Sequence, residues 1–319
     1  MVDLMVAPPQ LAALVDSWDG RIISSDVLLL LKVDDDLRAY STDVISRACA
    51  SGAANVRGKE IFAMIRELQR TVSKPPNLLP EITGLTSLPT RTNRAAWSLN
   101  RHVRRLVLDV VREQSSCSDD MNLLGAMLRS AGGTLAAAED FIVDNCKNIY
   151  FAGYETTAVT AAWCLMLLAL HPEWQARVRD EVRHACASAT PDLASSMHKM
   201  KTLAMVIQET LRLYPAGSVV SRQALRRGRR GRVRPGTLRS RTAAAAARVP
   251  SLGRRRARTS LGQSFAMAEL KALLALVLSK FEFSLSPDYV HSPALRLIVE
   301  PEHGVRLLLR RVVVEPSCC

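Results

Sequence analysis

The stretch DFIVDNCKNIYFAGYETTAVTAAWCLMLLALH, from Asp140 to His171, decides the fold. It predicts one long helix of roughly 30 residues, about 45 Å at ~1.5 Å per residue, which is enough to cross a whole domain. Its second half, from Val159 to Leu170, is apolar on nearly every side. A helix tolerates that only when it is buried. We therefore expect this segment to be the central helix of the core.

Polar residues interrupt this apolar helix near its middle, at Gly153, Glu155, Thr156 and Thr157. A glycine inside a helix costs about 1 kcal/mol relative to alanine, so it usually has a packing reason. Here it would let a flat or bulky group approach the backbone. A carboxylate and two hydroxyls beside that gap are typical of a proton-relay site inside a core. The same pattern also fits a polar notch that meets solvent or a loop.

Length and composition limit the class of protein. A chain of 319 residues can form one large core or two modest domains, and a hydrophobic content of 48% excludes a largely disordered chain. No apolar run reaches the ~20 uncharged residues that span a bilayer. The first ten residues, MVDLMVAPPQ, lack the basic start and apolar stretch of a signal peptide. We expect a soluble or peripheral protein.

The seven cysteines show no paired spacing apart from the doublet Cys318-Cys319. With an odd count and no secretory signal, we expect reduced thiols in a cytosol-facing protein rather than a disulfide framework. No CxxC or HExxH pattern indicates a zinc site.

The net charge of +13 comes from one segment. Between Thr210 and Ala268 there are 15 arginines and no aspartate, glutamate or lysine. Taking those 15 from the 43 basic residues leaves 28, against 30 acidic residues in the rest of the chain. Residues 226–256 carry most of this excess and show no apolar periodicity, so we expect this part to be disordered.

The rest of the chain predicts a mainly α-helical fold with a small β portion. Amphipathic patterns predict helices at Leu11–Trp18, Asp43–Cys49, Gly58–Val72, Asn93–Glu113, Met121–Leu128, Glu173–Cys186, Lys199–Tyr214 and Leu261–Phe281. A hairpin is predicted at the end, with strands Leu295–Glu300 and Val305–Arg310. Glu209 and Arg212 lie three apart on one helix face, a spacing typical of a solvated ion pair that contributes a few tenths of a kcal/mol.

Four motifs, taken in order, resemble those of the haem-thiolate monooxygenases, the cytochrome P-450 family. They are AGYETT (152–157), HPEWQ (171–175), ETLRLYP (209–215) and ARTSLGQSFAMAELK (257–271). The sequence of these motifs is most similar to that of plant enzymes in the clan that oxidises gibberellins and related terpenoids. The resemblance covers about residues 1–225 and 257–310. It implies a haem cofactor, an NADPH-dependent reductase as partner, and a small hydrophobic substrate that receives one atom of O₂.

The resemblance also assigns roles to the long helix. In the family, a cysteine thiolate behind the iron favours cleavage of the O–O bond. An acid and a threonine on the long helix route protons to the bound oxygen, and here these would be Glu155 and Thr156. Ala152 and Gly153 would leave room for O₂ above the haem plane.

Other residues would support the fold and the haem. By resemblance, Glu209 and Arg212 form a buried structural pair, in which the loss of one partner costs several kcal/mol. Arg222 and Arg258 match positions whose guanidinium groups pair with haem propionates. Gly262 matches the last glycine of the haem-binding loop.

The haem-binding loop departs from the family pattern Phe-x-x-Gly-x-Arg-x-Cys-x-Gly. Aligned on Arg258 and Gly262, the chain has Gly253 at the phenylalanine, Arg256 at the first glycine and Ser260 at the cysteine that ligates iron. A serine hydroxyl is a weak acid, and its oxygen is a harder and poorer donor to ferric haem than thiolate sulfur. We therefore expect this chain to be inactive even though its family is enzymatic.

Two further departures concern the ends of the resemblance. Residues 226–256 divide the helical part (1–225) from the end of the haem loop, the following helix and the hairpin (257–312), and we interpret them as a shifted reading frame or a mis-spliced region. A membrane anchor and a proline hinge are not found at the front of the sequence. A full-length relative would be expected at the endoplasmic reticulum membrane.

Two alternatives remain open. The chain is a non-catalytic relic that binds haem poorly or not at all, or residues 226–256 form a polybasic arm for RNA or an anionic membrane. The arm has no interleaved aromatic residues for base stacking and no nucleic-acid-binding motif, which disfavours nucleic acid.

Overall fold

A computed structural model of the chain describes residues 8–23, 28–49, 54–72, 89–115, 123–130, 135–186, 196–217, 260–296 and 298–312. Its elements are α2 (Pro8–Ile23), β1 (Leu29–Lys32), α3 (Asp34–Cys49), α4 (Ala54–Val72), α6 (Arg91–Ser115), α7 (Leu123–Ser130), α8 (Leu135–Leu170), α9 (Pro172–Cys186), α11 (Lys201–Leu213), α13 (Gln263–Lys280), β2 (Phe281–Leu285), β3 (Pro293–Arg296), β4 (Ile298–Pro301) and β5 (Arg306–Arg311). The predicted class, mainly α with a small β portion, is confirmed.

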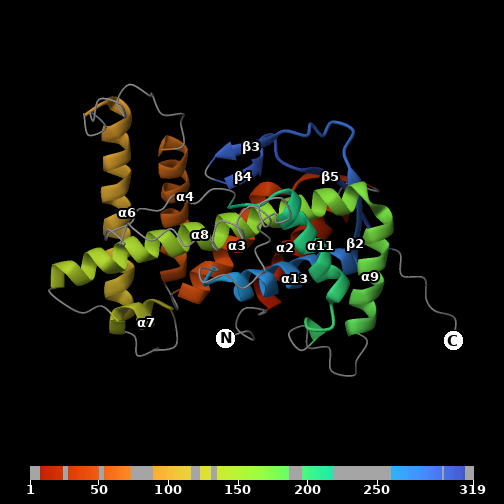
Figure 1. Cartoon of the computed structure of the whole chain (residues 1–319), viewed down its shortest axis with the longest axis horizontal. Helices are drawn as coiled ribbons and strands as arrows, with labels where there is room; N and C mark the ends of the chain where they lie inside the picture. Colours follow the sequence, from red (N-terminus) through yellow and green to blue (C-terminus); the bar gives the residue numbers. More distant parts are fainter. Residues whose placement is uncertain are drawn as a thin grey trace, which may run out of the picture.

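The long helix α8 runs through the molecule, and the other elements gather at its two ends (Figure 1). Around its first half, α4, α6, α7 and the end of α3 enclose a core that contains Phe62, Tyr150 and Tyr154. Around its second half, α2, α9, α11, α13 and the strands enclose a larger core that contains Trp18 and Trp163. α8 therefore belongs to both cores, as its apolar sequence predicts.

Part of α8, from Glu139 to Leu170, is long and apolar enough to cross a membrane, and no other helix of the described residues is. In the most apolar window of this span, 78% of the residues are buried inside the protein. Its hydrophobic surface is thus covered by neighbouring helices, as in the core helix that the sequence predicts.

Side chains of α9 hold the end of α8 and the beginning of α11. Pro172 is the first residue of α9, the position where a missing N–H is harmless. Gln175 donates to the carbonyl oxygens of Leu168 and Phe283, and Arg179 donates to that of Phe281. These bonds fix α8, α9 and β2 against one another. Similarly, the Glu181 carboxylate accepts the amides of Thr202 and Leu203 at 2.7 and 2.9 Å, and so caps the amino terminus of α11.

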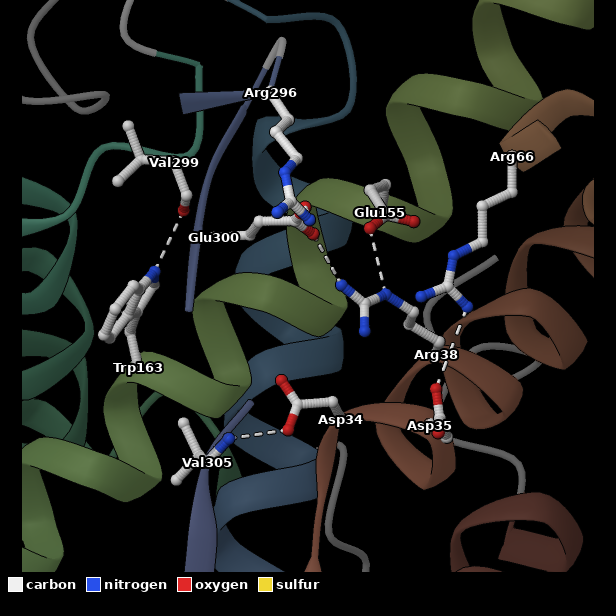
Figure 2. Close-up of polar contacts among 10 residues, drawn as sticks. All are labelled: Asp34, Asp35, Arg38, Arg66, Glu155, Trp163, Arg296, Val299, Glu300 and Val305. Atoms are coloured by element: carbon white, nitrogen blue, oxygen red, sulfur yellow. Dashed lines mark hydrogen bonds and ion pairs between the residues drawn. The ribbon is translucent and has the colours of Figure 1, made fainter. Parts of the chain in front are cut away.

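The predicted C-terminal hairpin is wrong. β4 pairs with β3, whereas β5 lies between β1 and β2 in a separate antiparallel sheet, with Leu307 opposite Leu31 and Leu285. Gly304, at a φ of +74°, makes the turn between β4 and β5. A Cβ there would lie 2.5 Å from the Asp34 carboxylate, which accepts the amide of Val305 at 2.7 Å (Figure 2). The tie to Asp34 directs the chain away from β4.

Arg222, Arg258 and the segment 226–256 lie outside the described residues, so the propionate-binding roles and the disorder expected for that segment stay predictions.

Candidate functional site

The middle of α8 has two different faces. Ala152 is exposed and Thr156, one turn later, is half-buried on the same side, where its hydroxyl donates to the Ala152 carbonyl at 2.7 Å. Glu155 lies about 100° around the helix from Thr156 and is buried. The structure therefore brings Ala152 and Thr156 together and directs Glu155 to the other side. The pairing of Glu155 with Thr156 as one proton-handling unit stays a prediction.

Gly153 makes room for a neighbouring helix. A Cβ added at this position would lie 2.6 Å from the Ile45 Cδ1 of α3, closer than carbon atoms pack. The sequence predicts a close approach at this glycine, and the group that approaches is an isoleucine side chain. The space left by the missing Cβ is filled by protein.

Glu155 belongs to a buried ion network (Figure 2). The Arg38 guanidinium of α3 donates from Nε to Glu155 and from Nη2 to Glu300 of β4, both at 2.9 Å. Burial disfavours the Arg38 charge, but Glu155, Glu300 and Asp34 outweigh it and raise the pKa of Arg38. One cation thus holds two carboxylates from elements far apart in the sequence.

Sequence reasoning missed Arg38 and Glu300. They lie 117 and 145 positions from Glu155, and no local pattern links them. The available signal was Glu155 itself, because a carboxylate inside an apolar helix needs a buried cation. Its second oxygen, Oε2, has no hydrogen-bond partner in the described part of the chain.

The expected burial of the Glu209–Arg212 pair is wrong. The side chains are 54% and 47% exposed, and Arg212 Nε donates to Glu209 at 2.7 Å. This hydrogen bond lowers the pKa of the Glu209 carboxyl. Both residues lie on the face of α11 opposite the buried Leu203, Ile207 and Leu211, so the pair is solvated. The solvated alternative offered by the i,i+3 spacing describes it correctly.

Ser260, at the predicted iron-ligand position, lies just before α13. The residue is exposed, and its carbonyl accepts the amide of Gln263 at 3.3 Å. Gly262 is the residue that precedes the first turn of α13, and nothing lies within 4 Å of the position of its Cβ. No described residue therefore packs against Gly262 on the side where a Cβ would lie.

Three of the four cysteines that the structure describes are unsuited to serve as an iron ligand. Cys49, Cys146 and Cys164 are buried within the helical cores, and burial raises the pKa of Cys146 and of Cys164 to about 12. Cys164 is also engaged with the Thr210 hydroxyl at 3.3 Å. Among the residues described, no group of three His, Cys, Asp or Glu side chains could hold a metal. At the position where the resemblance predicts a thiolate, the structure describes the exposed hydroxyl of Ser260, a donor that does not fit a thiolate-ligated haem iron.

Solved structures establish the class of fold. The heme domain of cytochrome P450DA aligns with a TM-score of 0.68 over 97% of this chain and 72% of its own, at 22% identity. A second crystal structure, of a cytochrome P450 named CYP102L1, aligns with a TM-score of 0.66 over 95% of this chain and 76% of its own, at 19% identity. At these identities the likeness concerns the fold alone.

Sequence comparison then gives the family. The profile of the family described as Cytochrome P450 matches residues 10–227, and the chain belongs to that family. It is 56% identical to cytochrome P450 714B1 of Oryza sativa subsp. japonica, over 98% of this chain and 65% of that protein. It is 50% identical to cytochrome P450 714B3 of Zea mays, over 98% of this chain and 63% of that protein. The predicted resemblance to plant members is confirmed, and the chain spans a little under two thirds of the length of these curated relatives.

Members of this family are haem-dependent monooxygenases, which confirms the predicted enzyme class and cofactor at the level of the family.

Proposed function

We propose that this chain carries the framework of a haem monooxygenase but does not complete the reaction. The family reaction inserts one atom of O₂ into a small hydrophobic molecule, which we propose to be terpenoid-like, with electrons from an NADPH-dependent reductase. A full-length relative would face the cytosol from the endoplasmic reticulum membrane. Support comes from the family membership, the plant relatives and the intact α8, which presents Ala152 and Thr156 on an open face.

One observation carries the proposed loss of activity. Ser260 is an exposed alcohol three residues before the start of α13, and by resemblance it occupies the position of the cysteine that ligates iron in the family. An alcohol stays protonated near neutral pH, whereas a thiol with a lowered pKa is anionic and a softer ligand. Without thiolate the iron lacks the electron donation that favours O–O cleavage. No step of the reaction is assigned to Glu155 or Thr156 in this chain.

A CO-difference spectrum tests the proposal. Purified protein is incubated with haem, reduced and exposed to CO, together with a Ser260→Cys variant. We expect no red-shifted Soret band of thiolate ligation from the native chain. That band in the native protein would overturn the proposed loss of the ligand.

The same samples separate a defective site from a relic. A Soret band that stays with the native protein through gel filtration means that the haem slot survives, and only the ligand is lost. Haem that elutes apart from both proteins means that the chain is a non-catalytic relic. A thiolate band gained by Ser260→Cys would identify the serine as the cause.

A further inference from the structure

Four aromatic side chains, which we call the ring cluster, extend from the core to the surface beside the end of α11. Trp163 of α8 is fully buried, and its indole Nε1 donates to the Val299 carbonyl at 3.0 Å (Figure 2). The ring of Tyr214, the C-cap residue of α11, stacks on that of Trp163 with centroids 4.2 Å apart and planes 11° apart. His291 is exposed, and its ring lies 5.9 Å from Trp163 and 5.8 Å from Tyr214. Tyr289 completes the ring cluster, 6.1 Å from His291.

The imidazole of His291 is shared by two phenols. Its Nε2 lies 3.3 Å from the Tyr214 hydroxyl, and its Nδ1 lies 3.0 Å from the Tyr289 hydroxyl. A neutral imidazole carries a proton on one nitrogen and accepts one on the other, so in either tautomer one of the two phenols donates to His291. Burial raises the pKa of Tyr289 to about 12, so this phenol keeps its proton near neutral pH. The ring cluster therefore holds a proton acceptor against a protonated phenol.

The other three of the five tyrosines lack this arrangement. Tyr40, Tyr150 and Tyr154 are buried, and burial raises the pKa of each. The Tyr154 hydroxyl has no hydrogen-bond partner among the described residues. A phenol that loses an electron becomes a strong acid, so its oxidation is favoured where a base takes the proton in the same step. Within the described part of the chain, Tyr214 and Tyr289 are the tyrosines that have such a base.

We propose that Tyr214, Tyr289 and His291 form a one-electron oxidation site that protects the core indole of Trp163 from radical oxidants. A diffusible radical, of the carbonate-radical class, takes one electron from the phenol that donates to His291. The phenolic proton passes to the imidazole nitrogen, which leaves a neutral tyrosyl radical and an imidazolium. If the electron is lost from Trp163 first, the phenol supplies it through the stacked ring of Tyr214, and the same two products form.

A reductant of the ascorbate class closes the cycle. It returns one hydrogen atom to the tyrosyl oxygen, and the imidazolium releases its proton to water through the exposed edge of His291. The net result is the reduction of one radical by one molecule of reductant. This site requires neither haem nor a hydrophobic substrate, so it goes beyond the function proposed above and does not depend on it.

Flash photolysis tests the proposal on the full chain. The parent protein carries Trp97→Phe and Trp174→Phe, because both of those indoles are exposed and would be oxidised directly. A ruthenium tris(bipyridine) photo-oxidant with persulfate supplies the one-electron oxidant, and transient absorption follows the phenoxyl radical. His291→Phe keeps a ring in the cluster and removes the base. His171→Phe, at an exposed histidine before α9, is the matched control, and circular dichroism verifies that each variant is folded.

We expect His291→Phe to slow phenoxyl formation on the order of 100-fold, the lower end of what a positioned base contributes. His171→Phe should leave the rate unchanged. Heavy water should slow the parent protein and have no such effect on His291→Phe. The double variant Tyr214→Phe/Tyr289→Phe should give no phenoxyl signal, although its three buried tyrosines remain. After continuous illumination with ascorbate, peptide mass spectrometry should find Trp163 oxidised in this double variant and intact in the parent.

Three results would overturn the proposal. Equal rates in the parent and in His291→Phe would show that the histidine only packs, because phenylalanine keeps the ring and lacks the base. A phenoxyl signal that survives in the double variant would place the radical on a buried tyrosine. Equal oxidation of Trp163 in the parent and in the double variant would exclude the protective role.

Discussion

The buried Glu269 predicts a marked loss of stability as the pH rises from about 4.5 to about 8. This residue of α13 is 2% exposed, and neither carboxyl oxygen has a hydrogen-bond partner among the described residues. The Ser41 hydroxyl is close enough to interact with the carboxyl but does not meet hydrogen-bond geometry. Burial raises the pKa of Glu269 to about 8 from an ordinary value of 4.5. The folded protein therefore holds a neutral acid at a pH where the unfolded chain holds a carboxylate.

The sign and size of the effect follow from proton linkage. Below pH 4.5 both states are protonated and the folded state carries no penalty. Between pH 4.5 and 8 the folded state binds more protons, so the free energy of unfolding falls as the pH rises. At about 1.4 kcal/mol per pH unit, the total loss approaches ~5 kcal/mol by pH 8. That is comparable with the whole stability of many domains.

Urea unfolding at pH 5, 7 and 9 measures this loss. The matched variant is Glu269→Gln, which keeps the shape of the side chain and cannot ionise. We expect the native protein to lose about 4 kcal/mol relative to the variant between pH 5 and 9. A difference between the two proteins that stays constant over this range would refute the reasoning, because it would place the native carboxyl in contact with water or a partner.

Three other predictions concern stability and use the same urea assay. Arg38→Met leaves the buried Glu155 carboxylate without its cation and should cost about 3–5 kcal/mol, whereas Glu209→Gln breaks an exposed pair and should cost under ~0.5 kcal/mol; equal costs would contradict the assigned burial. Gly153→Ala should destabilise by about 1–3 kcal/mol through overpacking against Ile45, and Ile45→Val should reduce that cost; additive effects of the two would argue against their contact. Glu181→Gln should cost about 1 kcal/mol, and the native advantage should fade as pH drops through the lowered pKa of this carboxyl; a pH-independent difference would exclude a charged cap.

The helices were predictable because their signals are local. The apolar run of α8, the proline that opens α9 and the proline beyond α11 each act within a few residues, and the structure places all three helices where these signals indicate. α8 begins at Leu135, five residues before the predicted start. Helix ends depend on neighbouring turns, which a periodic pattern does not contain.

The features that could not be predicted from the sequence depend on contacts between distant segments of the chain. β5 reads as the partner of the run before it, but its buried Leu307 and Leu309 pair with β1, nearly the whole chain away. The sequence indicates a close approach at Gly153, but it does not indicate that the approaching side chain is Ile45. Likewise, the position of Glu155 in an apolar helix indicates a buried charge, but nothing in the sequence indicates that Arg38 is its partner. The motif at 209–215 indicates the family, but whether Glu209 and Arg212 are buried depends on which segments pack against α11.

Because β5 lies between β1 and β2, β1 is synthesised long before the strand with which it pairs. Leu29 of β1 pairs with Leu309, 280 residues later in the chain. At about 5–20 residues per second on the ribosome, β1 waits roughly 15–55 s before its partner strand is made. During that interval the buried face of β1, which carries Leu31, lacks the strand that pairs with it in the folded protein.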